Sequence, residues 1–165
     1  MTTPLRKQRV FAWTVLALLL ALTAKAGERV AVTVVRVIDG DTVDVRLGGE
    51  RRRVRLLGVD TPEVAHRNKP GEPFGRVATS FTRKALDTAR SVKLEIEGDR
   101  VDGYGRTLGF LWLQPNGRAE PVNLSEELLR QGLGRVIRHF DYPGKARFFA
   151  AEEEARRARR GLWRQ

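Results

Sequence analysis

The feature that most constrains the fold is a strict alternation of apolar and polar residues on both sides of a double glycine. Positions 43, 45 and 47 are apolar before Gly48-Gly49, and Val54 and Leu56 alternate with Arg53 and Arg55 after it. A period of two predicts strands, here over residues 42–47 and 51–58, and the glycine pair predicts a hairpin turn between them. Each strand then has an apolar face to bury and a polar face that carries the arginines.

Three other stretches have the pattern of strands. Residues 30–37 form an almost continuous apolar run, residues 92–96 alternate, and residues 107–113 are apolar up to a Pro-Asn-Gly turn. The last two are expected to pair as a hairpin around residues 97–106.

Helical spacing of apolar residues predicts a helix over residues 74–89. A shorter helix can be capped by Asn123 or Ser125 and ends before Gly132. A last helix is expected over residues 145–160.

The charges of the last helix have a simple interpretation. Glu152 and Glu153 each stand four residues before an arginine, Arg156 and Arg157, and this spacing pairs them on one helix surface. The pattern favours a solvated helix face, since it explains the charges without a ligand.

Five strands, one helix after the third and two helices at the end predict an α+β fold. The pattern is consistent with a small closed barrel such as an OB-fold. A chain of 165 residues is expected to form one domain with one moderate core.

The first 26 residues have the composition of a secretory signal peptide. A basic start is followed by an apolar run at residues 10–22 and by Ala24-Lys25-Ala26, which fits a cleavage signal. The alternative is an uncleaved membrane anchor, but a run that spans a bilayer needs about 20 apolar residues. We therefore expect a signal peptide at residues 1–26 and the folded domain at residues 27–165.

The charge of the mature chain points to a polyanionic partner. Cleavage would remove four of the 31 basic residues and leave 27 against 20 acidic ones, a net charge of +7. A basic exported domain suits nucleic acid or an anionic surface. With no cysteine, no disulfide and no thiolate chemistry is available to the chain.

Four acidic residues gather where two predicted strands end, in "VIDGD" and "GVDTPE". Carboxylates that lie close together raise one another's pKa, so a cation is expected between them. Asp41, Asp60 and the carbonyl of Thr61 offer the oxygen ligands that a hard divalent cation prefers. Taken alone, "DGDT" reads as a turn capped by aspartate and "DTPE" as an ordinary loop start.

Two arginines change the balance between these interpretations. Arg55 stands five residues before Asp60 on a strand that leads into the acidic loop, and Arg106 follows Tyr104-Gly105. Guanidiniums beside a metal site can clamp a phosphate through bidentate hydrogen bonds.

Four motifs in this order resemble the staphylococcal nuclease (thermonuclease) family: "VIDGDTV", "VRLLGVDTPE", "DGYGR" and "LLRQGLGRV". The resemblance covers about residues 30–163. It implies a five-stranded OB-fold barrel with three helices and a calcium-dependent phosphodiesterase that cleaves DNA and RNA to 3′-phosphate ends.

The resemblance also implies a role for each matching residue. Asp41, Asp60 and the Thr61 carbonyl would bind Ca²⁺, and Asp39 would lie outside that shell. Glu63 would orient or deprotonate the attacking water, while Arg55 and Arg106 would clamp the phosphate. Tyr104 resembles the family's tyrosine beside the nucleotide phosphate, the alternative being a tyrosine that only packs at the barrel edge. Arg138 is a candidate substrate-binding residue at a position where this chain departs from the family.

Three positions depart from the family pattern. Arg138 and Phe140 stand where the family usually has tyrosines, and Gly103 replaces a lysine near the nucleotide. These changes bear on affinity and base preference, and they leave the metal and clamp residues intact.

The rival hypothesis is a non-catalytic OB-fold module that binds nucleic acid through basic and aromatic groups. Nothing in the sequence requires more than a monomer.

Overall fold

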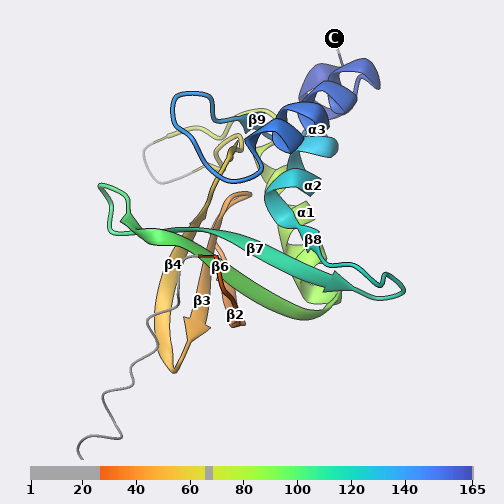
Figure 1. The fold of residues 1–165 in the computed structure, drawn as a ribbon. Helices are drawn as coiled ribbons and strands as arrows, with labels where there is room; N and C mark the ends of the chain where they lie inside the picture. Colours follow the sequence, from red (N-terminus) through yellow and green to blue (C-terminus); the bar gives the residue numbers. More distant parts are fainter. Residues whose placement is uncertain (1–26, 66–68, 165) are drawn as a thin grey trace, which may run out of the picture.

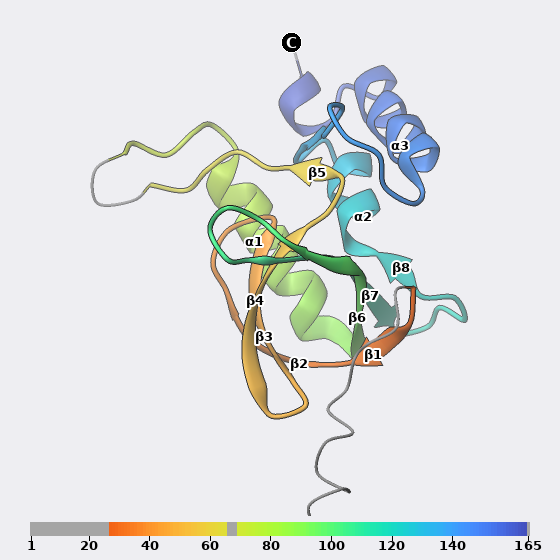
Figure 2. The same cartoon turned by 60° about the vertical axis from the view of Figure 1, so that its left-hand side comes forward.

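The computed structural model describes residues 27–65 and 69–164 (Figure 1). Within these ranges the helices gather on one side of the sheet, and the β3–β4 hairpin projects away from α3 (Figures 1 and 2). The helices are α1 (Gly75–Thr88), α2 (Leu124–Arg130), α3 (Lys145–Arg157) and the 3-10 turn η1 (Gly161–Trp163). The strands are β1 (Arg29–Ala31), β2 (Thr33–Val37), β3 (Thr42–Leu47), β4 (Glu50–Leu56), β5 (Val59–Asp60), β6 (Ala89–Val101), β7 (Thr107–Pro115), β8 (Val122–Asn123) and β9 (Arg135–Val136).

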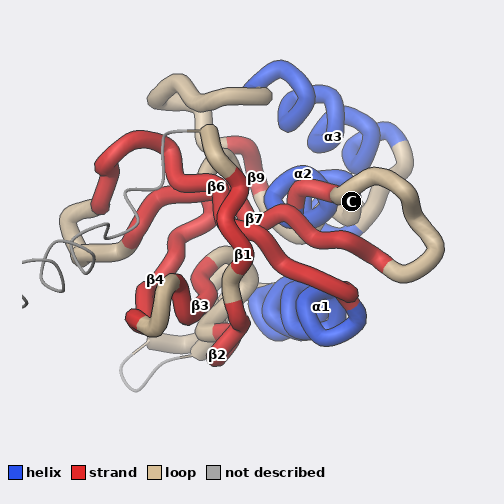
Figure 3. The backbone as a smooth tube through the Cα atoms, turned by 60° about the horizontal axis from the view of Figure 1, so that its bottom comes forward, coloured by secondary structure: helices blue, strands red, loops and turns tan. Residues whose placement is uncertain are grey.

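The main sheet has the strand order β1-β6-β7-β4-β3-β2, with β8 added beside β7. All its pairs are antiparallel except β4 with β7. Its two end strands, β1 and β2, are consecutive in the chain and flank Val32, whose N–H donates to the Val92 carbonyl at 3.0 Å. The run of residues 30–37 that was predicted as one strand is therefore two strands, of which β1 pairs with β6 and β2 pairs with β3. The sheet curls, and α1 lies along one side of it (Figure 3). The mixed α+β class is confirmed, whereas a closed five-stranded barrel stays a prediction.

The β3–β4 hairpin forms as its alternation predicts. Val43, Val45, Val54 and Leu56 are fully buried on its inner face. Gly48 and Gly49 make the turn with φ of 57° and 91°, a left-handed backbone that glycine adopts at little cost. Burying this apolar face is the main contribution of the hairpin to the core.

The three helices lie close to where the sequence places them. Asn123 caps α2 by accepting hydrogen bonds from the N–H groups of Ser125 and Glu126 at 3.0 and 3.3 Å. The last helix ends at Arg157, three residues before the predicted end, because Arg159 has a left-handed φ of 50°. Phe148 of α3 is fully buried and meets Phe110 of β7 edge to face.

The interpretation of α3 as having a solvated acidic face is wrong for Glu152. This residue is only 2% exposed, and it accepts the Val136 N–H at 3.0 Å. Its pair with Arg156 exists, at 3.4 Å, but Arg138 lies closer. Glu153 behaves as predicted, since it is exposed and pairs with Arg157 at 3.1 Å.

No helix in the two described ranges is long and apolar enough to cross a membrane. The predicted signal segment, residues 1–26, lies outside those ranges.

One acid on the outer face of the hairpin is buried by arginines. Asp44 is 1% exposed and pairs with Arg51 at 2.6 Å, Arg53 at 2.8 Å and Arg36 at 3.5 Å. The hydrogen bond from Arg53 is the main cause that lowers the Asp44 pKa from 3.8 to about 2; burial opposes it, and Arg51 adds to it. A period of two alone suggests that the polar face of β3 is in contact with solvent. Asp44 on this face is instead covered by arginine side chains.

Asp44 should make stability depend on pH at the acid end. Its pKa is lower in the folded chain, so its contribution is complete above pH 3.8 and is lost as the pH falls toward 2. The shift corresponds to about 2 kcal/mol. Urea unfolding of the parent and of Asp44→Asn between pH 6 and pH 2 should show a stability gap that narrows by about this amount. A gap that stays constant would contradict the assignment.

Candidate functional site

The two acidic segments meet at Asp41. Its Oδ2 accepts the Thr61 N–H at 2.7 Å and the Thr61 hydroxyl at 3.0 Å, and it is 5% exposed. Gly40 permits this approach, because a Cβ there would lie 2.6 Å from the Thr61 hydroxyl oxygen. Asp39 accepts the Asp41 N–H at 3.2 Å, which is the aspartate-capped turn expected from "DGDT".

Arg55 links the acids of the two segments. Its Nη1 lies 3.1 Å from Asp41 Oδ2, and its Nη2 donates to Asp60 Oδ1 at 2.7 Å. Nη1 also donates to the Val59 carbonyl at 2.7 Å, so the guanidinium is fixed against β5. One planar cation therefore holds Asp41 and Asp60 in one cluster.

The surroundings of Asp41 disfavour its charged form. Burial raises the pKa of Asp41 to about 6; Arg55 opposes this, and the nearby Asp39 adds to it. A cation bound at this point would favour the ionised carboxylate. The donors present, two carboxylates and the Thr61 main chain, suit a hard cation.

The described residues contain no group of three or more histidine, cysteine, aspartate or glutamate side chains that could hold a metal. A cation at Asp41 and Asp60 would thus also need oxygen ligands from the main chain, water or substrate. This is the ordinary coordination of Ca²⁺, which takes carbonyl and water oxygens readily.

The second predicted clamp residue, Arg106, comes from the β6–β7 turn. Its Nε donates to Asp102 at 2.6 Å, and its Nη1 reaches the Thr42 hydroxyl at 3.5 Å. Thr42 is the strand partner of Arg55, so the turn lies beside the acidic cluster. Tyr104 is 87% exposed, with its ring centroid 5.2 Å from the Arg106 guanidinium.

A cavity of about 520 Å³ brings several predicted site residues together. Arg55, Asp60 and Arg106 line it together with the segment Arg135–Phe140. Arg138 belongs to this lining, but it also pairs with Glu152 and lies over the Phe149 ring at 4.7 Å. The cavity combines cationic groups with apolar walls, as a site for a nucleotide would require.

Glu63 is not part of this cavity. Its side chain is exposed and lines a neighbouring cavity of about 330 Å³ with Glu72 and Arg76. Its main chain is fixed, because its N–H donates to the Glu72 carboxylate at 3.2 Å and its carbonyl accepts the Glu72 N–H at 2.9 Å. The role predicted for Glu63 stays a prediction.

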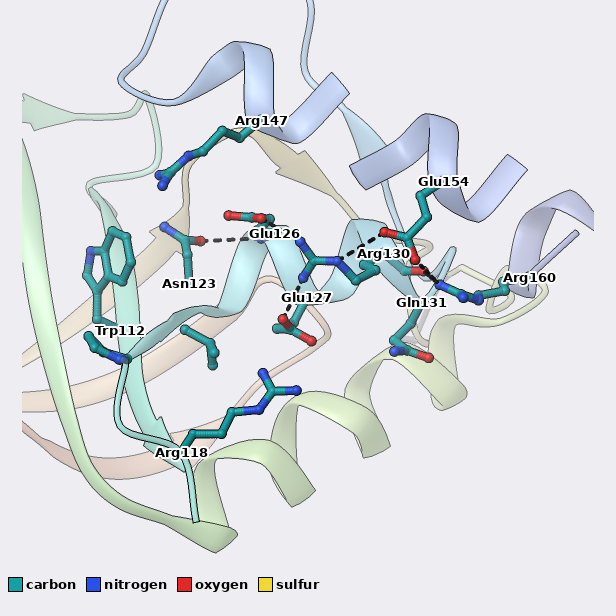
Figure 4. A pocket seen from close by; sticks show the side chains of 12 residues that line it. Trp112, Arg118, Asn123, Glu126, Glu127, Arg130, Gln131, Arg147, Glu154 and Arg160 are labelled. Atoms are coloured by element: carbon teal, nitrogen blue, oxygen red, sulfur yellow. Dashed lines mark hydrogen bonds and ion pairs between the residues drawn. The ribbon is translucent and has the colours of Figure 1, made fainter. Parts of the chain in front are cut away.

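A cavity of about 740 Å³, the largest of those described here, lies elsewhere, between β7, β8, α2 and α3 (Figure 4). None of the predicted site residues lines it. Arg130 occupies its middle and pairs with Glu126 at 2.5 Å, Glu127 at 2.6 Å and Glu154 at 3.3 Å.

Glu152 is a residue whose place in this region the sequence did not reveal. It anchors β9 through Val136, and β9 pairs with β5 in the register Val59 to Val136 and Asp60 to Arg135. Its second oxygen holds Arg138 at 2.5 Å. The buried carboxylate thus connects α3 to the segment Arg135–Phe140 that lines the cavity. Its spacing from Arg156 gave no signal of this, because that spacing also fits a surface pair.

Comparison with known proteins gives a consistent result. The sequence model of the family described as "Staphylococcal nuclease homologue" matches residues 53–165. The chain is similar to a thermonuclease of Staphylococcus hyicus, with 36% identity over 79% of this chain and 73% of the relative. It is similar to a thermonuclease of Staphylococcus intermedius at 39% identity, over 78% and 73%. A micrococcal nuclease of Shigella flexneri matches at 35% identity, over 79% and 71%.

The position of Glu152 predicts an effect that its neighbour should not share. Glu152→Gln removes the charge that holds Arg138 and Arg156 and weakens the bond to Val136, so it should lower the free energy of unfolding by about 2 kcal/mol. Glu153→Gln is the matched control, since it breaks only an exposed pair and should cost less than about 1 kcal/mol. Urea unfolding of both variants measures the difference. Equal effects would show that Glu152 acts only as a surface residue.

Proposed function

The chain belongs to the staphylococcal nuclease family, and from this membership we propose that it is an exported, calcium-dependent nuclease that hydrolyses DNA and RNA. The products would carry 3′-phosphate ends. The observation that supports this proposal best is the placement of Arg55 and Arg106 with Asp60 around one cavity, next to the buried Asp41.

The arginines suit a phosphodiester substrate. Attack of water on phosphorus increases the negative charge on the phosphate oxygens, and fixed guanidinium groups stabilise that charge. Both arginines are held by acids, Arg55 by Asp60 and Arg106 by Asp102. They are therefore oriented before substrate arrives, so binding costs less side-chain entropy.

Asp41, Asp60 and the Thr61 carbonyl would hold Ca²⁺, and Asp39 would support Asp41 from outside the ligand shell. When bound, the cation supplies positive charge that polarises the phosphate. The raised pKa of Asp41, caused mainly by burial, is consistent with this role, because a bound cation would favour the ionised carboxylate.

Glu63 would hold the attacking water and accept its proton. It follows Thr61 by two residues and has an exposed carboxylate. Because Glu63 lines a different cavity from Arg55 and Arg106, we propose that its carboxylate turns toward the phosphate when substrate binds. Arg138 from the lining of the 520 Å³ cavity, and the exposed Tyr104 beside Arg106, would contact the nucleotide.

One observation favours the rival function, a non-catalytic nucleic-acid-binding module. Glu63 and the two arginines line different cavities, and a binding module needs no general base. The acids argue against this rival function. A pure binder would have no use for the buried Asp41 beside Asp60, because two carboxylates would repel a phosphate. Activity measurements therefore separate the two functions.

Export is proposed from the signal-like residues 1–26, ahead of a nuclease domain at residues 27–165. N-terminal sequencing of protein recovered outside the cytoplasm should give a start near Gly27. A start at Met1 would instead support an uncleaved anchor. We expect a monomer in either case.

The catalytic hypothesis predicts that two variants fail for different reasons. A general base contributes about 10²–10⁴-fold in rate, and a transition-state arginine about 10³–10⁵-fold in phosphoryl transfer. Glu63→Gln and Arg106→Ala should both nearly abolish hydrolysis of single-stranded DNA and of RNA. Glu63→Gln should bind a non-hydrolysed oligonucleotide at least as well as the parent, whereas Arg106→Ala should bind it more weakly.

Parental hydrolysis should require Ca²⁺ and stop on chelation, and added Ca²⁺ should rescue neither variant. Circular dichroism verifies folding, and Arg83→Ala, on the exposed side of α1, is a control that should keep parental activity. Full activity of Glu63→Gln would contradict its role as the base. A parent that cleaves neither substrate with any metal would support the binding module.

A further inference from the structure

The outer face of the β2–β3–β4 sheet carries a row of arginines that the catalytic cluster does not use. In β4, alternate residues Arg51, Arg53 and Arg55 lie on one face, because Val54 and Leu56 between and after them are buried. The register places Arg53 opposite Asp44 and Arg51 opposite Arg46, while Arg36 of β2 lies opposite Asp44 from the other side. We call Arg36, Arg46, Arg51 and Arg53 the arginine track.

A single buried acid orients most of the track. Asp44 pairs with Arg36, Arg51 and Arg53, whose side chains remain 59%, 52% and 47% exposed. One carboxylate cannot neutralise three guanidiniums, so the group stays strongly positive. Each guanidinium carries several N–H donors, and Asp44 occupies only part of them. The exposed remainder can bind anionic oxygens from solution.

The track is continuous with the proposed catalytic cluster. Arg55, two residues after Arg53 on the same face of β4, bridges Asp41 and Asp60. At about 3.4 Å per residue, Arg51 lies about 14 Å from Arg55 along the strand. This length corresponds to about four stacked nucleotides of a single strand.

The other arginine-rich region, around the 740 Å³ cavity, differs in charge balance. There Arg130 pairs with three glutamates, and Arg160 pairs with one of them, Glu154. The track has one buried acid for three arginines, and the fourth arginine, Arg46, donates from its side chain to the Gly49 carbonyl at 3.3 Å. The lining of that cavity has three glutamates against four arginines, so we expect a polyanion to prefer the track.

We propose that the arginine track binds the phosphates of a nucleic-acid strand on one side of the scissile bond, so that the protein holds long strands more tightly than dinucleotides. The inference rests on the proposed nuclease function, because it extends that same site. The contacts are to phosphate and carry no base specificity.

Binding of fluorescein-labelled oligothymidylates with two and with twelve nucleotides, in EDTA to prevent cleavage, tests the track. Arg36→Gln/Arg46→Gln leaves Asp44 paired with Arg51 and Arg53, so it should fold like the parent. It should bind the twelve-nucleotide strand about tenfold more weakly and reduce the slope of log K against log salt by about 1.4. Its affinity for the dinucleotide should not change.

Arg83→Gln/Arg90→Gln is the matched control, since it removes the same charge from exposed positions outside the track. An equal loss in this control would reduce the effect to net charge and overturn the proposal. The proposal is also overturned if the track variant binds the twelve-nucleotide strand as tightly as the parent does. This holds even if the variant has lost affinity for anionic lipid vesicles, because the track would then bind lipid and not nucleic acid. Binding in EDTA does not depend on turnover. The track could thus be confirmed in a protein that proves inactive, or overturned in one that cleaves normally.

Discussion

The carboxylate of Asp41 joins two segments 20 residues apart in the chain, and the arrangement of the site depends on this bond. Together with the bonds from Arg55 to Val59 and Asp60, it fixes the segment that follows β5 against the start of β3. Burying an ionised carboxylate is expensive, and here the main-chain N–H of Thr61, two hydroxyls and Arg55 only partly offset the cost. The raised pKa of Asp41 reflects the remainder. A site that holds an acid at this cost is suited to bind a cation.

The acids of this basic chain have a common structural use, which is to orient arginines. Asp60 holds Arg55, Asp102 holds Arg106, and Asp44 holds Arg53, each through a bond of 2.8 Å or less. A free arginine side chain has many rotamers, and fixing it on binding costs free energy. A carboxylate at its base pays part of that cost during folding and leaves other N–H donors for an anion. This arrangement explains why acidic residues accumulate at the points where phosphate contacts are proposed.

The sequence predicted those features that depend on local pattern. The β3–β4 hairpin followed from the period of two and Gly48-Gly49, and the cap of α2 followed from Asn123. It failed for Glu152 and Asp44, whose burial is caused by residues from other elements: Arg138 and β9 for the first, Arg36 and Arg53 for the second. The division of the first predicted strand was missed for the same reason, since Val32 bonds to a strand 60 residues later. Local spacing cannot distinguish a surface pair from a buried one.

The contacts of the Glu63 main chain limit how its carboxylate can reach a bound phosphate. Its main chain is held on both sides by Glu72, and a Cβ at Gly75 would lie only 2.3 Å from the Glu63 carbonyl oxygen. Moving this backbone would break those hydrogen bonds and disturb its close contact with the start of α1. A change in the side-chain torsions of Glu63 requires no such movement of the main chain. The contacts of the main chain therefore favour an approach of the Glu63 carboxylate to a bound phosphate through its side-chain torsions.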